Sequence, residues 1–354
     1  MPLKIGILTY HWSTNHGAVL QAWCLQEYLQ ELGHEVDVIN YKPRKLDLTW
    51  LRIALHPRRW LSLGRQLATR RKEALLVPFR NRYLHLTRRF RSLRELEASL
   101  DRYDVLVSGS DQVLNPSFTL HGQDGHPSPA YWLGVGGARA GRIGYAVSFG
   151  CEAYPEDAAA YAQDWVRRFD VVGVRENMGL RILDQLGYEG PRCQVPDPTM
   201  LLGAGLFGKL GVPLPGSRGS YTCVYMLRRE VGWEGEVRFI DDRHSPLTVE
   251  AWLGTIAGAK DMVTNSYHGM LAALFAHVPV AVLLEKGAGS GMNDRFLTVL
   301  DALGIPDRVA WTVREAQEVL RRPIDFDALD AAVSRYAGVG KDFLKDSLSA
   351  LAEG

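Results

Sequence analysis

The sequence contains few cysteines, and they form no local metal-binding or disulfide motif. Only 4 Cys occur in 354 residues, at positions 24, 151, 193 and 223, and no two of them have the CxxC spacing. Thiols so scattered argue against a zinc finger and against a small disulfide scaffold. We therefore expect reduced cysteines. No other group of residues has metal-ligand spacing either, so we expect no metal site and no cofactor.

Long hydrophobic runs and an excess of one charge are also missing. No apolar run reaches the length of a membrane span, and the chain starts with a strand-like run in place of a signal peptide. We therefore expect a cytoplasmic protein. The formal net charge of +1 gives no field for nucleic-acid binding. A Walker loop, a GxSxG and a zinc-protease helix are absent, which argues against the commonest enzyme classes.

Short apolar runs alternate with amphipathic segments, a pattern typical of parallel sheets covered by helices. Strands are predicted at 4–9, 36–41, 104–108, 142–148, 170–174, 221–226, 237–240, 261–264 and 278–284. Helices are predicted at 17–32, 154–169, 177–186, 251–257, 270–276 and 326–351. A stretch rich in Gly and Pro at 203–219 is typical of a linker or hinge.

Two α/β domains, 1–203 and 204–354, follow from this pattern, because one hydrophobic core rarely supports a chain of this length. Two such domains face each other across a cleft, a usual place for small-molecule sites. The last helix is a candidate to pack back on the first domain.

The segment at about 52–102 is rich in Arg and poor in acids, and its Leu and Ala keep a helical rhythm. Solvated helices explain such a segment. A basic face toward a membrane surface or an anionic, lipid-linked acceptor explains it as well. Both interpretations stay open at this point.

Polar clusters follow several predicted strands, at the position where parallel sheets bind ligands. Asn15, His16 and Gly17 come after the first strand, at a helix start suited to an anion, although Asn15 is also a plain helix cap. Asp111 comes after a later strand and is a candidate general base, or else the cap of a turn. The hydroxyl and amide groups around it belong to Ser108, Ser110 and Gln112.

Three later clusters, from Arg175 onward, offer cations and a histidine after strands or loops. Arg175 enters a helix with its forked donors placed for a carboxylate or phosphate. His268 stands near a helix start behind Ser266 and before Gly269, as an acid or base in an anion pocket or as a structural histidine. Arg295 follows a glycine-rich loop as an anion clamp or as part of an ordinary helix start.

Taken in order, these clusters resemble the polysaccharide pyruvyltransferase family, and the resemblance runs over nearly the full chain. The motifs that carry it are Thr14–Ala22, Ile39–Pro43, Ser108–Asn115, Tyr145–Gly150 (which includes Ser148), Val174–Glu176, Pro196–Thr199, Ser266–Gly269 and Asn293–Arg295. Each motif alone is weak, but eight in one order are specific.

The resemblance implies two domains arranged as in GT-B glycosyltransferases. It also implies transfer of pyruvate from phosphoenolpyruvate, a co-substrate, to two hydroxyls of a saccharide acceptor. By position, Arg175 and His268 match the residues expected to hold phosphoenolpyruvate. The second domain is then the donor side, with Ser266 and Gly269 near the donor, and the first domain is the acceptor side. Some members carry Arg where this chain has Ser266, so Arg295, Lys286 or Lys260 would have to compensate.

From these residue types we expect His268 to protonate the donor, Arg175 and Arg295 to bind its anionic groups, and Asp111 to deprotonate the acceptor hydroxyl. A nucleotide-sugar glycosyltransferase and a non-catalytic carbohydrate-binding protein are the rival interpretations. Neither the acceptor nor the oligomeric state follows from the sequence.

Overall fold

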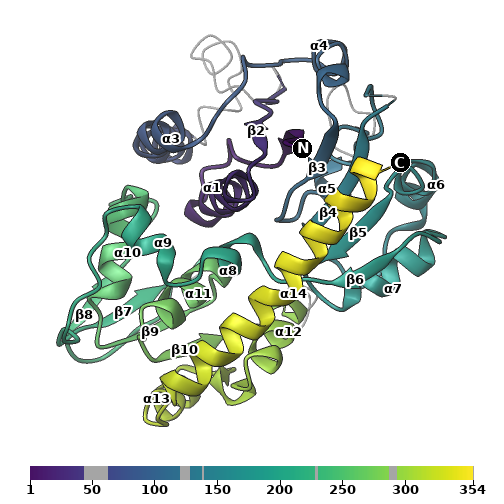
Figure 1. Ribbon diagram of the computed structural model, residues 1–354. Helices are drawn as coiled ribbons and strands as arrows, with labels where there is room; N and C mark the ends of the chain where they lie inside the picture. The colour runs from purple at the N-terminus through teal and green to yellow at the C-terminus, as the bar shows by residue number, and fades with distance from the viewer. Residues whose placement is uncertain (44–62, 120–127, 138, 228–229, 287–292, 354) are drawn as a thin grey trace.

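The computed structural model describes residues 1–43, 63–119, 128–137, 139–227, 230–286 and 293–353, and shows two sheets flanked by helices (Figure 1). The first sheet has the strand order β2-β1-β3-β4-β5-β6, and the second has the order β11-β10-β9-β7-β8. Neighbouring strands are parallel throughout. The predicted fold class, two Rossmann-like α/β domains, is confirmed.

The strands of the first sheet are β1 (Lys4–Leu8), β2 (Glu35–Val38), β3 (Val105–Ser108), β4 (Gly141–Val147), β5 (Val171–Val174) and β6 (Arg192–Gln194). Those of the second are β7 (Thr222–Tyr225), β8 (Val237–Phe239), β9 (Asp261–Thr264), β10 (Val280–Leu283) and β11 (Val309–Ala310). All nine predicted strands are present, and the sequence pattern missed only the short β6 and β11 of the described strands.

The helices up to the second sheet are α1 (His16–Glu31), α3 (Leu63–Tyr83), α4 (Leu93–Glu97), α5 (Pro116–Thr119), α6 (Glu156–Val166), α7 (Met178–Gln185), α8 (Pro198–Leu202) and α9 (Gly205–Lys209). Those after β7 are α10 (Val249–Ala257), α11 (Tyr267–Phe275), α12 (Asp294–Ala302), α13 (Val313–Leu320) and α14 (Phe326–Glu353). Short 3-10 turns lie at Leu100–Arg102 and Pro306–Arg308.

The stretch predicted as a linker is partly a packed element. Helix α9 falls within 203–219, and its Leu206 and Phe207 are fully buried. The glycines there stand between apolar side chains that join the hydrophobic core, so 205–209 is not an open linker.

Helix α1 lies between the two sheets and packs on α8, α10 and α11 (Figure 1). It is buried on nearly every side, and Trp23 and Leu25 are among its fully buried side chains. One continuous hydrophobic cluster contains residues of α1 and of both sheets. The two domains are therefore joined through a shared core around α1.

Helix α14 runs along both domains (Figure 1). Near its start, Phe326 stacks on His277 of the second domain at 4.8 Å between ring centroids. Near its end, Leu351 packs so closely on β4 that a Cβ on Gly141 would lie 2.6 Å from its Cδ1. The long final helix thus contacts both sheets.

Both sheets reverse their strand order at one point, between β1 and β3 in the first and between β7 and β9 in the second. Ligands bind outside the carboxyl ends of the strands at such points. The loops that follow β1, β3 and β9 carry the polar clusters predicted from the sequence. The topology therefore gathers those clusters between the domains.

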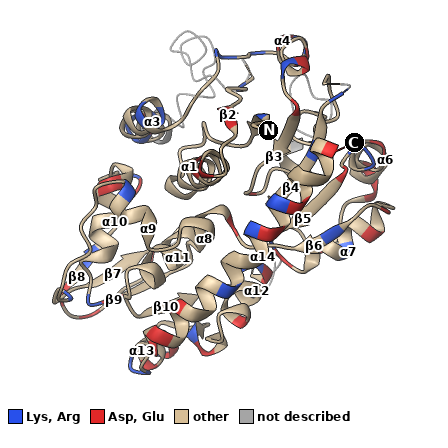
Figure 2. Ribbon diagram, viewed as in Figure 1, with Lys and Arg blue, Asp and Glu red and all other residues tan. Residues whose placement is uncertain are grey.

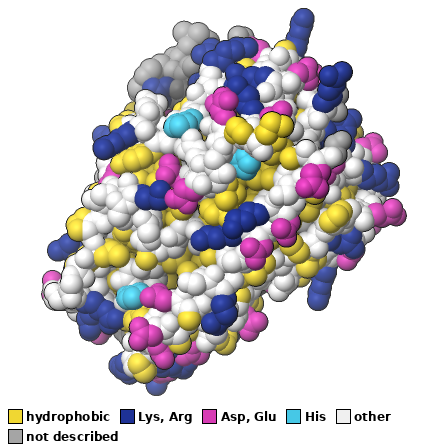
Figure 3. Space-filling view, in the orientation of Figure 1, with side chains coloured by type: hydrophobic (Ala, Val, Ile, Leu, Met, Phe, Trp, Pro, Cys, Tyr) yellow, Lys and Arg dark blue, Asp and Glu magenta, His cyan; other side chains and the backbone are white. Residues whose placement is uncertain are grey.

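The basic segment lies partly outside the described residues, since 44–62 are not described. In the described part, Lys72 of α3 pairs with Asp242 of the second domain, and Arg80 donates to the backbone oxygen of Ser13 at 2.7 Å. Other Lys and Arg residues lie along α3 and α4 (Figure 2), and basic and acidic side chains are interspersed over the face seen in Figure 3. At least two of these cations therefore tie α3 to its neighbours. In the described ranges, no helix has both the length and the hydropathy to cross a bilayer.

Candidate active site

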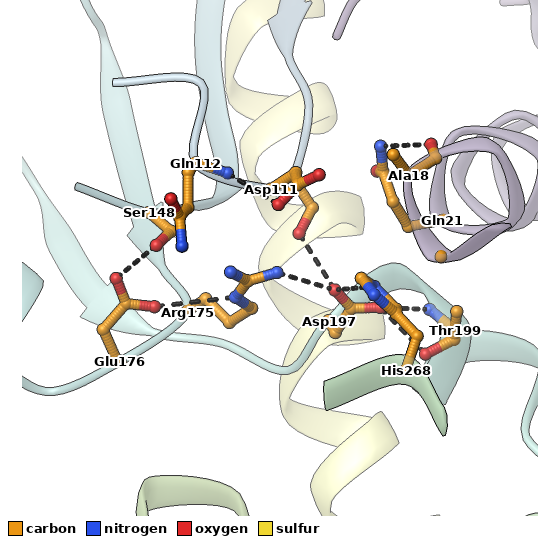
Figure 4. A network of polar contacts seen from close by, with 12 residues as sticks. Ala18, Gln21, Asp111, Gln112, Ser148, Arg175, Glu176, Asp197, Thr199 and His268 are labelled. Atoms are coloured by element: carbon orange, nitrogen blue, oxygen red, sulfur yellow. Dashed lines mark hydrogen bonds and ion pairs between the residues drawn. The ribbon is translucent and has the colours of Figure 1, made fainter. Parts of the chain in front are cut away.

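Asp197 is the centre of a buried polar network between the domains (Figure 4). Its Oδ2 accepts from the Ser110 hydroxyl at 3.1 Å and from Arg175 Nη1 at 3.3 Å, and lies 3.3 Å from His268 Nε2. Its Oδ1 accepts from the backbone N–H and the hydroxyl of Thr199 at 3.0 and 2.8 Å. Burial alone would raise the pKa of this carboxyl, but His268 and Arg175 hold it well below its ordinary value. Asp197 is thus a carboxylate that ties Arg175 to His268.

His268, in the first turn of α11, is held from two sides. Nε2 faces Asp197, while the rest of the ring meets the start of α1, where a Cβ on Gly17 would lie 2.0 Å from His268 Nδ1. Only glycine permits this approach. No hydrogen-bond partner of Nδ1 lies among the described residues. The Asp197 carboxylate thus holds Nε2 of the ring, while Nδ1 lies against the backbone of Gly17.

Arg175 and Arg295 bring two cations to the ring of Tyr267. The guanidinium carbons lie 4.8 and 5.8 Å from its centroid. Arg175 Nη2 and Arg295 Nε are buried and have no hydrogen-bond partner within the described ranges. Burial and the charge of Arg175 lower the pKa of Arg295 to about 10, so it still carries a charge at neutral pH. A buried guanidinium group and a partly buried one, each with an unused buried donor, are a candidate site for an anion.

Glu176 orients Arg175 from the opposite side to Asp197. The Ser148 hydroxyl donates to Glu176 Oε1 at 2.5 Å, and Oε2 lies 3.5 Å from Arg175 Nε (Figure 4). Burial disfavours the charge of Arg175, but Glu176 and Asp197 raise its pKa above the ordinary value. The Arg175 side chain is therefore fixed in place and permanently charged.

Asp111 lies on the loop after β3, close to this network (Figure 4). Its φ of +81° is rare outside glycine, and such strain costs about 1–3 kcal/mol and gathers at functional sites. Its Oδ1 accepts from the backbone N–H of Gln112 at 2.9 Å, and Gln112 is held in turn by Asn115 at 3.1 Å. The negative charge of Asp111 also favours the charged forms of both site arginines. The charge of Asp111 thus acts on both arginines of the candidate anion site.

Three other predicted residues shape the loops beside the network. Asn15 caps α1 by accepting from the N–H of Gly17 at 2.8 Å, and Ser266 caps α11 by accepting from the N–H of Gly269 at 3.2 Å. A Cβ on Gly269 would come within 3.1 Å of Tyr225 Cδ1. For Asn15 and Ser266, the structure thus shows the capping role.

The structure places three predicted site residues elsewhere. His16 is fully buried, stacks on Trp252 at 5.2 Å and binds the backbone oxygen of Leu247, and burial lowers its pKa to about 4. The fully buried Ser108 donates to the backbone oxygen of Tyr131 at 2.7 Å. Lys286 is exposed, with Nζ 5.5 Å from the ring centre of Trp311. Their side chains serve packing or lie apart from the network, so we leave them out of the site.

The sequence comparisons give the family. A family model described as polysaccharide pyruvyl transferase matches residues 15–286. This chain belongs to that family. No curated protein matches the sequence. The matched range contains the whole Asp197 network and ends before Arg295.

Solved structures similar to this member of the family share little sequence with it. UGT89C1 of Arabidopsis thaliana, complexed with UDP-L-rhamnose, is 10% identical at a TM-score of 0.48, over 100% of this chain and 99% of its own. An O-GlcNAc transferase of Thermobaculum terrenum is 13% identical at a TM-score of 0.47, and the match covers 99% of this chain and 67% of that one. The ADP-heptose lps heptosyltransferase II of E. coli is 13% identical at a TM-score of 0.37, and the match covers 94% of this chain and 99% of that one. Likeness at this level says nothing about the substrate of this family member.

A cavity of about 670 Å³ opens at the carboxyl ends of β7 and β8 of this family member. Besides apolar side chains, its lining includes Glu230, Asp241, Asp242 and Arg243. Among the described lining residues, Asp242 is paired with Lys72 of α3. The Asp197 network and the arginine pair at Tyr267 are not part of the described lining.

Proposed function

We propose that this transferase moves the pyruvate unit of phosphoenolpyruvate onto two hydroxyls of a saccharide, which forms a cyclic ketal and releases phosphate. The observation that carries the proposal is the pair of arginines, Arg175 and Arg295, each with a buried and unused donor, next to the His268–Asp197 pair. Phosphoenolpyruvate has a carboxylate and a phosphate, and each suits a guanidinium group. Family membership supports the same reaction class.

The departure at Ser266 fits this arrangement. Ser266 caps α11 and contributes no cation, while Arg175 and Arg295 already supply two at one ring. We propose that these two arginines bind the donor without a third at position 266. The loops after β1 and β3 then form the acceptor side.

The proposed reaction gives each of these groups a role. Protonated His268 gives its proton to the methylene carbon of phosphoenolpyruvate, and C2 gains oxocarbenium character. The first acceptor hydroxyl attacks C2 and passes its proton to Asp111. The second hydroxyl then displaces phosphate from C2, and its proton leaves with the phosphate. The proton held by Asp111 is released to solvent and His268 takes one up from solvent, which restores both groups. Arg175 and Arg295 stabilise the negative charge that gathers on the leaving phosphate.

The test is to incubate the protein with phosphoenolpyruvate and a panel of saccharides. We expect phosphate release together with a product heavier than the acceptor by one pyruvate less one water, seen by mass spectrometry. His268→Gln should lower the rate by about 10²–10⁴, the usual contribution of general acid–base catalysis. His244→Gln, at an exposed histidine, is the matched control and should keep the wild-type rate. Full turnover by His268→Gln would contradict its role as the acid.

A further inference from the structure

Four aromatic side chains gather at the carboxyl ends of β1 and β3. Tyr10 is met edge-on by Trp12, Phe118 and Tyr131, with centroids 5.5, 5.9 and 4.5 Å away. We call Tyr10, Trp12, Phe118 and Tyr131 the aromatic platform. The mechanism above uses none of them.

The aromatic platform has a fixed base and an open outer edge. Tyr131 is buried, and its hydroxyl accepts from Trp12 Nε1 at 3.1 Å. Tyr10 and Trp12 are half-buried, and Phe118 is 51% exposed. Rings that are held from below and reachable from outside form a preorganised surface, which lowers the entropic cost of binding.

Charged groups border these rings. Lys42 Nζ lies 5.6 Å from the ring centre of Trp12 and 3.0 Å from Glu73 Oε1 of α3. Arg80 holds the loop that carries Tyr10 and Trp12 through the backbone oxygen of Ser13. A ligand on the rings would thus meet both a cation and an anion at its edge.

The aromatic platform also adjoins the reacting groups. The loop with Tyr10 and Trp12 leads directly into Gly17, which touches His268. Phe118 follows the β3 loop that carries Asp111, and the charge of Asp111 acts on the Tyr10 hydroxyl. The rings therefore lie on the side of the site where Asp111 would meet an acceptor hydroxyl.

We infer that the aromatic platform binds a pyranose ring of the saccharide acceptor. A pyranose has an apolar face of C–H groups and a rim of hydroxyls. The aromatic rings would contact the apolar C–H face, and the charged groups beside Trp12 would hydrogen-bond to the hydroxyls. The inference rests on the proposed function and names the subsite that would position the acceptor near Asp111.

Saturation-transfer difference NMR on the full chain tests this without phosphoenolpyruvate. The probes are the methyl β-pyranosides of glucose, galactose and mannose. We expect the strongest transfer to ring C–H protons. Binding should be about threefold to tenfold weaker in Phe118→Ala and in Trp12→Ala, and Trp12→Phe should restore part of it. Tyr161→Ala removes an equally exposed ring on α6 and should change nothing.

The inference is overturned if none of the three pyranosides binds the wild type, or if binding survives in both alanine variants. If Trp12→Ala does not fold, Phe118→Ala decides, because that ring is half exposed. Pyranoside binding that depends on these rings, without any ketal formed in the turnover assay, would overturn the proposed function and keep the platform. Ketal formation in the turnover assay without any pyranoside binding would overturn the platform and keep the proposed function.

Discussion

Asp197→Ala is expected to destabilise the protein by about 3 kcal/mol or more and to abolish measurable turnover. Removing one partner of a buried ion pair leaves the other charge uncompensated, which usually costs about 3–5 kcal/mol. Here Arg175 keeps Glu176 at 3.5 Å, which places the loss near the lower end. His268 also loses the carboxylate that orients it. Denaturant unfolding and phosphate release measure the two effects.

The acid limb of the stability curve gives a second measurement on Asp197. The pKa of Asp197 is lower in the folded protein than in the unfolded chain. Its contribution to the free energy of unfolding is therefore complete above about pH 4 and declines as the pH falls further. Asp197→Asn should flatten this decline. Asp184→Ala, which removes an exposed carboxylate paired with Arg192, is the control and should change stability by less than about 1 kcal/mol. An Asp197→Ala protein with wild-type unfolding and turnover would contradict the network.

Gly17→Ala is expected to lower kcat by about 10² or more. The new Cβ would lie 2.0 Å from Nδ1, 2.3 Å from Cγ and 2.6 Å from Cβ of His268. Because the clash reaches the His268 Cβ, a ring rotation alone cannot relieve it, so α1 or α11 must shift. A misplacement of about 1 Å in a catalytic group can reduce the rate about 10²-fold. Steady-state kinetics with phosphoenolpyruvate measure the effect.

The control for Gly17→Ala is Gly338→Ala in α14, where an added Cβ meets nothing within 4 Å. That change should leave kcat as it is and stabilise the helix by about 0.4–1 kcal/mol. Circular dichroism checks that both variants fold. A wild-type kcat in a folded Gly17→Ala protein would show that His268 does not depend on its contact with α1.

Much of the fold could be predicted from the sequence, because its strands are short buried runs between amphipathic helices. β9 was predicted at its observed bounds. β6 and β11 were missed for a physical reason. β6 is an edge strand of three residues with partly exposed side chains, and β11 has two residues, so neither forms an apolar run.

The candidate site was predictable where a polar residue follows a strand or a glycine-rich loop. Arg175, His268 and Asp111 were proposed from the first pattern, and Arg295 from the second. Asp197 was predicted only as part of the Pro196–Thr199 motif, because Asp followed by Pro is also the pattern of an ordinary helix N-cap. It does cap α8. Its links to Arg175 and His268 span 22 and 71 residues, a separation that local patterns do not carry. His16 shows the converse, since a neighbour of Gly17 in sequence turns toward Trp252 in space.

The central claim is that phosphoenolpyruvate binds at the arginine pair, and thermal unfolding with this ligand tests it most directly. At about 100 times its dissociation constant, phosphoenolpyruvate should stabilise the wild type by about 2.7 kcal/mol. The shift should vanish in Arg175→Ala and persist in Arg181→Ala, which removes an exposed arginine of α7. Uridine and guanosine diphosphates should give no such shift. A wild type stabilised by these nucleotides and not by phosphoenolpyruvate, or a phosphoenolpyruvate shift that survives in Arg175→Ala, would contradict the account.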